Sequence, residues 1–284
     1  METIAPIQRL SLYSRFVKLE HTVFSLPLIY AGALLAGRGG FSGELALLIF
    51  LAAVGGRVAA MGLNRIIDVE IDRRNPRTQV RELPRELLHV WEGWVVVALG
   101  TVVYVFSAIH IAPICLVLAP LPLILFVIYP YLKRLTMLTH LGLGLAWSMG
   151  PLGGWLAASK SLDGIGEVGW LWLFSVLWVA GFDIIYAILD VDFDRREGLF
   201  SMPATLGTAR ALAVARLLHA GAFLSLLALW WVQAFSPPSL IWLAAIGAAL
   251  IVEHRLAVRK PEVAFFQCNA VIGFLVLAFV WFGV

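Results

Sequence analysis

Charged residues are scarce in this sequence. Asp, Glu, Lys and Arg make up 14% of its 284 residues, whereas apolar residues make up 61%. A soluble domain is about 25% charged and about 45–50% apolar. With a mean hydropathy of +0.90, the chain has too few charges to cover its apolar surface in water. This excludes a soluble domain and predicts an integral membrane protein.

Cysteine is also scarce, and no long polar linker interrupts the chain. Cys115 and Cys268 both lie in apolar stretches, so we expect core side chains rather than a disulfide or a metal pair. Nucleic acid is not an expected partner, because the net charge of +3 is small and follows membrane side. We expect a single membrane domain over residues 1–284.

The apolar residues fall into segments long enough to span a bilayer. A spanning helix needs about 20 mostly apolar residues, and nine such segments use most of the chain. Pro113, Pro120 and Pro122 are expected to kink the fourth. The first segment alone could also be a signal-peptide core. The predicted spans are residues 22–37, 43–67, 90–109, 111–129, 138–158, 168–190, 210–232, 238–256 and 263–283.

Basic residues predict the orientation of this all-α polytopic bundle. Only Arg38 and Lys160 fall on the side reached after odd-numbered spans. The remaining Lys and Arg belong to the N-terminal segment, to the loops after even-numbered spans, or to helix ends that meet those loops. Because Lys and Arg are enriched in cytoplasmic loops, we expect the N-terminus and these loops to be cytoplasmic.

Two predicted helices carry a stripe of polar side chains. Spacings of four and seven residues return to nearly the same helix face. Charges within a span cost about 2.5–3.5 kcal/mol each and mark functional positions by default. Asp192 points away from the second stripe and is left out. The first stripe is Arg57, Asn64, Asp68 and Asp72, and the second is Asp183, Tyr186, Asp190 and Asp194.

The two stripes indicate an internal repeat, because Asp68 is as far from Asp190 as Asp72 is from Asp194. We predict pseudo-repeats at roughly 16–135 and 136–260, followed by a final helix. Carboxylates at one depth repel unless cations lie between them, which suggests two hard divalent ions. Mg²⁺ usually takes one or two carboxylates and fills its other positions with water and phosphate oxygens. The alternative is that these acids pair with nearby arginines in a solvated loop.

Basic side chains follow both acidic motifs and the fourth span. Metal ions together with Lys and Arg at one membrane face suit a diphosphate. Plain positive-inside topology explains most of the same residues. The candidates for binding a diphosphate are Arg77, Lys133, Arg134 and Arg195.

Over essentially its whole length, the sequence resembles the UbiA superfamily of intramembrane aromatic prenyltransferases. The resemblance is carried by Asn64-Arg65-Ile66-Ile67-Asp68-Val69-Glu70-Ile71-Asp72 and by Tyr186-Ala187-Ile188-Leu189-Asp190-Val191-Asp192-Phe193-Asp194. Supporting pieces begin at His21, Tyr129 and Ser201. The flanking sequences look most like the 4-hydroxybenzoate polyprenyltransferase branch, which includes menaquinone-pathway relatives.

This resemblance implies a bundle with a central cavity open to lipid and a cap on the cytoplasmic side. It implies that Asn64, Asp68, Asp72, Asp190 and Asp194 hold Mg²⁺ (two ions bridged by the diphosphate) and that Lys133, Arg134 and Arg77 help bind the diphosphate. The implied reaction is Mg²⁺-dependent transfer of a polyprenyl group to the ring of an aromatic acid, in ubiquinone or menaquinone biosynthesis. The implied location is the bacterial inner membrane, with the active site facing the cytoplasm.

Several side chains keep two interpretations. Arg57 could bind the carboxylate of an aromatic acid or form a buried ion pair with Asp183. Asp183 could otherwise orient the ring or take its proton. Tyr186 could contact the ring or simply pack. His21 is a weak site candidate, and the other histidines, His89, His110, His140, His219 and His254, are expected at interfaces or in packing.

Two other classes compete with the enzyme. A cation-coupled transporter also uses intramembrane carboxylates and repeats, but its coupling sites usually lie near the membrane midplane. A membrane phosphatidyltransferase also combines Asp motifs with Mg²⁺, but no Asp-Gly follows the first motif. The sequence does not fix the acceptor, a benzoate or a naphthoate, nor the prenyl length or the oligomeric state.

Overall fold

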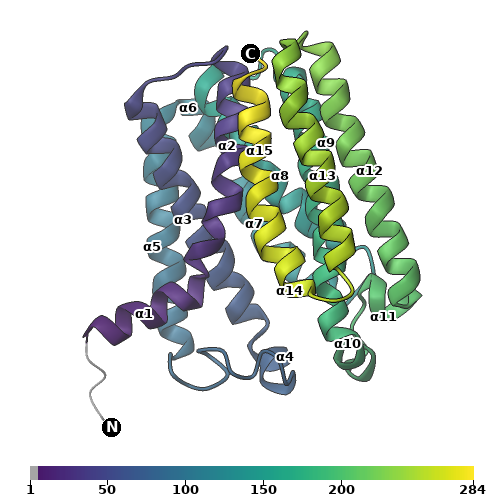
Figure 1. Cartoon of the computed structure of the whole chain (residues 1–284). Helices are drawn as coiled ribbons and strands as arrows, with labels where there is room; N and C mark the ends of the chain where they lie inside the picture. The colour runs from purple at the N-terminus through teal and green to yellow at the C-terminus, as the bar shows by residue number, and fades with distance from the viewer. Residues whose placement is uncertain (1–5) are drawn as a thin grey trace.

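A computed structural model describes residues 6–284, and every regular element in that range is a helix. The long helices run alternately up and down a single bundle (Figure 1). They are α2 (Thr22–Ala36), α3 (Gly43–Ile67), α5 (Val90–Ile111), α7 (Pro120–Leu132), α8 (Thr139–Ser159), α9 (Gly169–Ala187), α12 (Thr208–Val232), α13 (Leu240–Leu256) and α15 (Asn269–Trp281).

Seven helical segments within residues 6–284 are long and apolar enough to cross a membrane by length and composition. Helix α8 is not among them, and α2 contributes the shorter apolar stretch Ser25–Ala36. The chain is therefore an integral membrane protein by these criteria. The count of nine spans stays a prediction, although every predicted segment coincides with helical residues.

The fourth predicted span is broken, as its prolines indicated. It forms α6 (Pro113–Leu118) and α7, which are separated at Ala119. Pro113 and Pro120 each stand at the start of a helix, where a missing N–H costs nothing. The predicted kink is confirmed.

Short helices cover the two ends of the bundle. One end holds α1, α4, α10, α11 and α14, and the C-terminus lies at the other (Figure 1). The loops that follow α3 and α9 therefore meet at the same end. The short elements are α1 (Pro6–Val17), η1 (Leu19–His21), α4 (Val69–Arg74), η2 (Ile165–Val168), η3 (Ile188–Asp190), α10 (Val191–Glu197), α11 (Met202–Leu206), η4 (Pro237–Ser239), α14 (Pro261–Val263) and η5 (Ala264–Cys268).

Each acidic motif lies across a helix break rather than within one continuous helix. Asp68 follows the last residue of α3 with φ −96° and ψ 3°, and Asp190 precedes α10 with φ −110° and ψ 4°. The expectation of an unbroken helical stripe is wrong at these two residues. The helical turn nevertheless continues through the first break, because the Asp72 N–H donates to the Asp68 carbonyl at 2.8 Å.

Helices α2 and α8 pack with their backbones in contact. A Cβ atom added to Gly154 would lie 1.9 Å from the Ile29 carbonyl oxygen, and one added to Gly32 would lie 2.0 Å from that of Pro151. Small residues allow membrane helices to approach this closely. The largest apolar core adjoins this contact and includes Trp155, Phe174, Trp178, Phe182 and Phe279. Cys115 and Cys268 are free and partly buried, as expected.

Candidate active site

A cavity of about 550 Å³ lies inside the bundle and collects most of the predicted site residues. Its lining extends from the aspartates of both motifs to apolar residues of α5 and α6, such as Ile111 and Leu118. The predicted residues that line it are Arg57, Asn64, Asp68, Asp72, Arg77, Lys133, Asp183, Tyr186, Asp190 and Asp194. One cavity thus joins a charged end to an apolar interior.

Asp68 is almost fully buried, at 4% exposure, and takes its partners from two helices. Lys133, just beyond α7, places its Nζ 2.5 Å from Oδ2, and Asn64 on the preceding turn donates to the same oxygen at 3.3 Å. Oδ1 accepts no hydrogen bond, and the Arg134 guanidinium lies 3.6 Å from it. Burial raises the pKa of the Asp68 carboxyl, and the charge and hydrogen bond of Lys133 oppose the rise.

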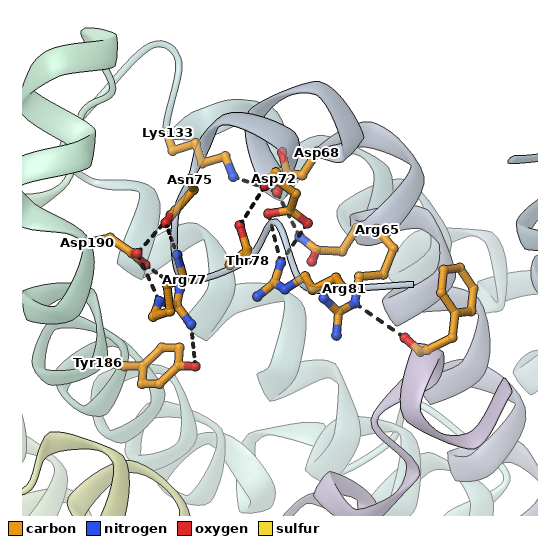
Figure 2. Close-up of polar contacts among 12 residues, drawn as sticks. Arg65, Asp68, Asp72, Asn75, Arg77, Thr78, Arg81, Lys133, Tyr186 and Asp190 are labelled. Carbon is orange, nitrogen blue, oxygen red and sulfur yellow. Dashed lines mark hydrogen bonds and ion pairs between the residues drawn. The ribbon is translucent and has the colours of Figure 1, made fainter. Parts of the chain in front are cut away.

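Asp72 is held by the loop that follows its own helix. One Arg81 nitrogen, NH1, donates to both carboxylate oxygens, at 2.9 and 2.7 Å. The Thr78 hydroxyl donates to the Asp72 carbonyl at 3.2 Å (Figure 2). This loop therefore folds back over the first motif.

The same loop also supplies the partners of Asp190 in the second motif. The Asn75 amide donates to Asp190 Oδ1 at 2.8 Å, and the Arg77 Nε donates to the same oxygen at 2.9 Å. A second Arg77 nitrogen, NH2, donates to Oδ2, so the contact is bidentate. Figure 2 shows Arg77 between Asp190 and Tyr186, whose hydroxyl accepts from Arg77 NH1 at 2.8 Å.

Arg77 stays charged despite its partial burial. Burial lowers the pKa of its guanidinium, but the hydrogen bonds and charge of Asp190 outweigh this, so the pKa is raised. Bidentate Arg–carboxylate pairs are among the strongest polar contacts in proteins. The second motif is thus tied to the loop of the first, and an Arg74–Glu197 ion pair at 2.6 Å joins the two segments again.

Asp194 has a neutral partner instead of a cation. The Ser201 hydroxyl donates to its Oδ2 at 2.7 Å, and the same hydroxyl oxygen caps α11 by accepting from the Ala204 N–H. Of the four motif carboxylates, this one has no ion pair with a described Lys or Arg.

Deeper in the cavity, Arg57 and Asp183 do not form the ion pair that we considered. Asp183 instead contacts His140, whose Nδ1 lies 2.7 Å from Oδ2. Arg57 makes no ion pair with a described carboxylate, its Nε has no hydrogen-bond partner, and its guanidinium lies 5.8 Å from the Trp147 ring centre. Because Arg57 also lines the cavity, its charge remains available to a ligand.

His140 was expected to be a packing residue, and the structure corrects this. It is buried, lines the cavity and bonds Asp183. Its Nε2 accepts from the Met202 N–H at 3.1 Å, which leaves Nδ1 to carry the proton toward Asp183. The signal was the isolated Asp183, since a carboxylate within a span needs a polar partner on a facing helix.

Two predicted residues lie outside the cavity lining. Arg134 NH2 donates to the Ile67 carbonyl at 2.8 Å, and Arg195 Nε donates to the Ala204 carbonyl at 2.9 Å. Asp192 is exposed and also lies outside the lining, as expected. The side chain of His21 is outside the described part of the structure. Conversely, Asn75, Arg81 and Ser201 line the cavity and bond the motif aspartates but were not among the candidates.

The oxygen donors at the charged end of the cavity resemble the ligands of a divalent cation. Within residues 6–284, no group of three or more His, Cys, Asp or Glu side chains could hold a metal ion. Mg²⁺, however, usually takes only one or two carboxylates and completes its shell with water and phosphate oxygens. Oδ1 of Asp68, which is buried and accepts no hydrogen bond, is an oxygen ligand of that kind. The oxygen donors therefore fit Mg²⁺ held jointly with a phosphate-bearing substrate.

Comparison with known proteins agrees with this geometry. The UbiA prenyltransferase family model matches residues 25–282. A 4-hydroxybenzoate octaprenyltransferase of Coxiella burnetii is 27% identical over 282 residues, which cover 95% of each chain.

Two solved structures have the same fold. The apo structure of a UbiA homologue from Aeropyrum pernix K1 has a TM-score of 0.86 and 37% identity, over 92% of this chain and 97% of that one. A UbiA homologue from Archaeoglobus fulgidus, bound to GPP and Mg²⁺, has a TM-score of 0.69 at 17% identity, over 95% and 98%. The family model covers most of the chain, and both aspartate motifs line one cavity. The chain is therefore a member of the UbiA prenyltransferase family.

Proposed function

We propose that this prenyltransferase moves a polyprenyl group from a polyprenyl diphosphate to the ring of an aromatic acid, with 4-hydroxybenzoate as the favoured acceptor. The observation that carries the proposal is the single cavity. Its charged end holds Asp68, Asp190 and their basic partners, and its mostly apolar interior carries Arg57 and the Asp183–His140 pair. Such a cavity suits two substrates, one with an anionic head and an apolar tail and the other a separate acidic acceptor.

The charged end suits the diphosphate. Asn64 and the four motif aspartates would hold Mg²⁺, in our proposal two ions, which when bound offsets the charge of the diphosphate leaving group. Lys133 and Arg77 bring fixed positive charge to the same place, where negative charge grows as the allylic C–O bond breaks. The apolar walls keep water away from the allylic cation. Arg134 and Arg195, outside the lining, would act by supporting the loops.

The interior suits the acceptor. The Arg57 guanidinium matches a carboxylate, which it can bind through two parallel hydrogen bonds. The Met202 N–H bonds His140 Nε2, so that His140 Nδ1 donates to Asp183 Oδ2. The Asp183 carboxyl group, held in this position, would orient a phenol or accept a proton from the ring. Tyr186, whose hydroxyl accepts from Arg77, also lines the cavity.

The relative from Coxiella burnetii favours a benzoate acceptor and hence ubiquinone synthesis. A naphthoate acceptor in menaquinone synthesis is the alternative within the same chemistry. The distribution of Lys and Arg supports a cytoplasmic active site and N-terminus, and the cavity would open to lipid so that a long tail can extend from it.

The test is product analysis with the purified protein in lipid nanodiscs. Given geranyl diphosphate, Mg²⁺, 4-hydroxybenzoate and 1,4-dihydroxy-2-naphthoate together, we expect mass spectrometry to detect the prenylated benzoate, and none with EDTA. Prenylated naphthoate alone would move the chain to the alternative acceptor. Failure with both acceptors by folded protein, together with substrate-dependent uptake into proteoliposomes, would point to a transporter.

The variant Arg57→Met tests whether the acceptor and the diphosphate bind at different ends of the cavity. The substitution removes one charge-assisted contact, which contributes about 1.5–3 kcal/mol. Because about 1.4 kcal/mol corresponds to a tenfold change in affinity, the KM for 4-hydroxybenzoate should rise at least about tenfold. The KM for geranyl diphosphate should stay within about twofold, because Arg57 makes no contact with the motif aspartates. An equal rise in both values would contradict the assignment of Arg57 to the acceptor.

A further inference from the structure

The last helical hairpin contains an irregular turn next to the cavity. Between α14 and α15, residues Ala264–Cys268 form a π-helix, whose backbone hydrogen bonds span five residues instead of the four of an α-helix. Such turns are rare, cost backbone hydrogen bonds and occur often at functional sites. The only residue of this turn that lines the cavity is Phe265.

Buried polar side chains hold this turn in place. The Asn269 amide donates to the carbonyl oxygens of Phe265 at 2.8 Å and Ala264 at 3.3 Å, and to Glu253 Oε1 at 3.2 Å. Asn269 and Glu253 are both completely buried. Buried polar groups are costly unless they are bonded, and the Asn269 amide finds its backbone partners in this turn.

The turn presents the Phe265 ring to the active site. Its centre lies 4.1 Å from that of Tyr186, with the planes 26° apart, and 5.5 Å from that of Phe182. The Tyr186 ring also lies 4.9 Å from the Arg77 guanidinium, and its hydroxyl accepts from Arg77. A chain of contacts therefore runs from Asn269 through Phe265 and Tyr186 to Arg77 and Asp190.

We propose that Phe265, set by the Asn269-bonded π-helical turn, is a positioning residue for Arg77 and Asp190. The inference rests on the proposed function, since it assigns Phe265 to the diphosphate end of the site. Stacking on Phe265 holds the Tyr186 ring in place. The Tyr186 hydroxyl in turn holds Arg77 NH1, the nitrogen that does not bond Asp190. A regular α-helix would turn residue 265 away from its present direction by changing the register of the turn.

The first test needs no substrate. Fluorotyrosine is incorporated and the ¹⁹F signal of Tyr186 is assigned by its loss in Tyr186→Phe. We expect Phe265→Leu and Asn269→Leu to shift this signal in the same direction, whereas the exposed Gln267→Ala in the same turn leaves it unchanged. An unchanged Tyr186 signal in both leucine variants overturns the proposal. Should Asn269→Leu fail to fold, Phe265→Leu alone decides it.

The second test separates positioning from general packing. Phe265→Leu should raise the KM for geranyl diphosphate about 3- to 10-fold, the size of one aromatic pair, with the KM for 4-hydroxybenzoate within about twofold. Phe265→Tyr, which keeps a ring, should restore the wild-type value. A rise confined to the acceptor KM, or no rescue by Phe265→Tyr, overturns the proposal. If the wild-type protein neither binds nor uses geranyl diphosphate, the proposed function fails, and the ¹⁹F comparison still decides whether Asn269 controls the Phe265–Tyr186 contact.

Discussion

The two aspartate motifs have the same backbone form but different partners. Asp68 and Asp190 share nearly the same φ and ψ at a helix break. Asp68 is paired with Lys133, Asp72 with Arg81, and Asp190 with Arg77, whereas Asp194 bonds only the Ser201 hydroxyl. All three cations come from the stretch between the first motif and Lys133, the residue that follows α7.

The two motifs are similar in sequence but differ in the charged residues that pair with their carboxylates. Each motif ends in Asp-Arg-Arg, yet none of the arginines in these two tripeptides lines the cavity. Arg74 pairs with Glu197, and Arg195 bonds a backbone carbonyl. The two motifs match in the backbone at Asp68 and Asp190 and in their carboxylates, whereas the cations that pair with them all come from residues 77–134.

The largest expected effect tests what the motifs share. Asp68→Asn and Asp190→Asn should each lower turnover at least about 100-fold, as expected for loss of a metal ligand. Product formation by mass spectrometry measures it. Asp192→Asn is the matched control, because this exposed carboxylate lies between the second-motif aspartates but outside the cavity, and should keep its activity. Full activity in both motif variants would show that these acids serve topology only.

The next prediction tests the asymmetry of charge. Arg77→Ala leaves Asp190 without its bidentate partner and should lower kcat/KM at least about tenfold. Arg195→Ala, the loss of an exposed arginine of the second half, should change it less than about twofold. Steady-state rates with geranyl diphosphate compare the two. Equal losses would mean that each half supplies its own cation, which contradicts the asymmetry.

The smallest expected effect concerns the neutral partner. Ser201→Ala removes one hydroxyl donor from Asp194, a contact of about 0.5–1.5 kcal/mol, so activity should fall about two- to tenfold. Ser201→Thr should restore it, since it keeps the hydroxyl. Ser159→Ala, at the far end of α8, controls for a general loss of serine hydrogen bonds. A loss as large as that in Asp190→Asn would place Ser201 among the principal groups of the site.

The sequence predicted those features that depend on spacing along one helix. Asn64, Asp68, Asp72, Asp190 and Asp194 all line one cavity, as their four-residue spacing indicated, although the helix breaks at Asp68 and Asp190 were not predicted. The break near Ala119 follows from proline chemistry. Helix locations likewise followed from apolar length. These features need no knowledge of which elements touch.

Features that depend on how distant segments meet were missed. His140 reaches Asp183 only because α8 packs beside α9, and Arg81 reaches Asp72 only through the return of its loop. Arg195 looked equivalent to the basic residues after the first motif, but it donates to the Ala204 carbonyl in the neighbouring helix α11. Periodicity predicts the direction in which a side chain leaves its own helix axis. It does not predict which residue of another segment the side chain meets.

The close contact of α2 with α8 bears on how substrates enter and leave. Helix α2 precedes the first motif and α8 precedes the second, and their backbones touch at Gly32 and Gly154. Transporters built from repeats work by rocking one half against the other, which requires a seam that can slide or part. Two backbones in direct contact leave no side-chain layer to repack during such a motion. The α2–α8 contact is therefore expected to stay fixed during substrate exchange, which would use the opening to lipid and the loops at the charged end.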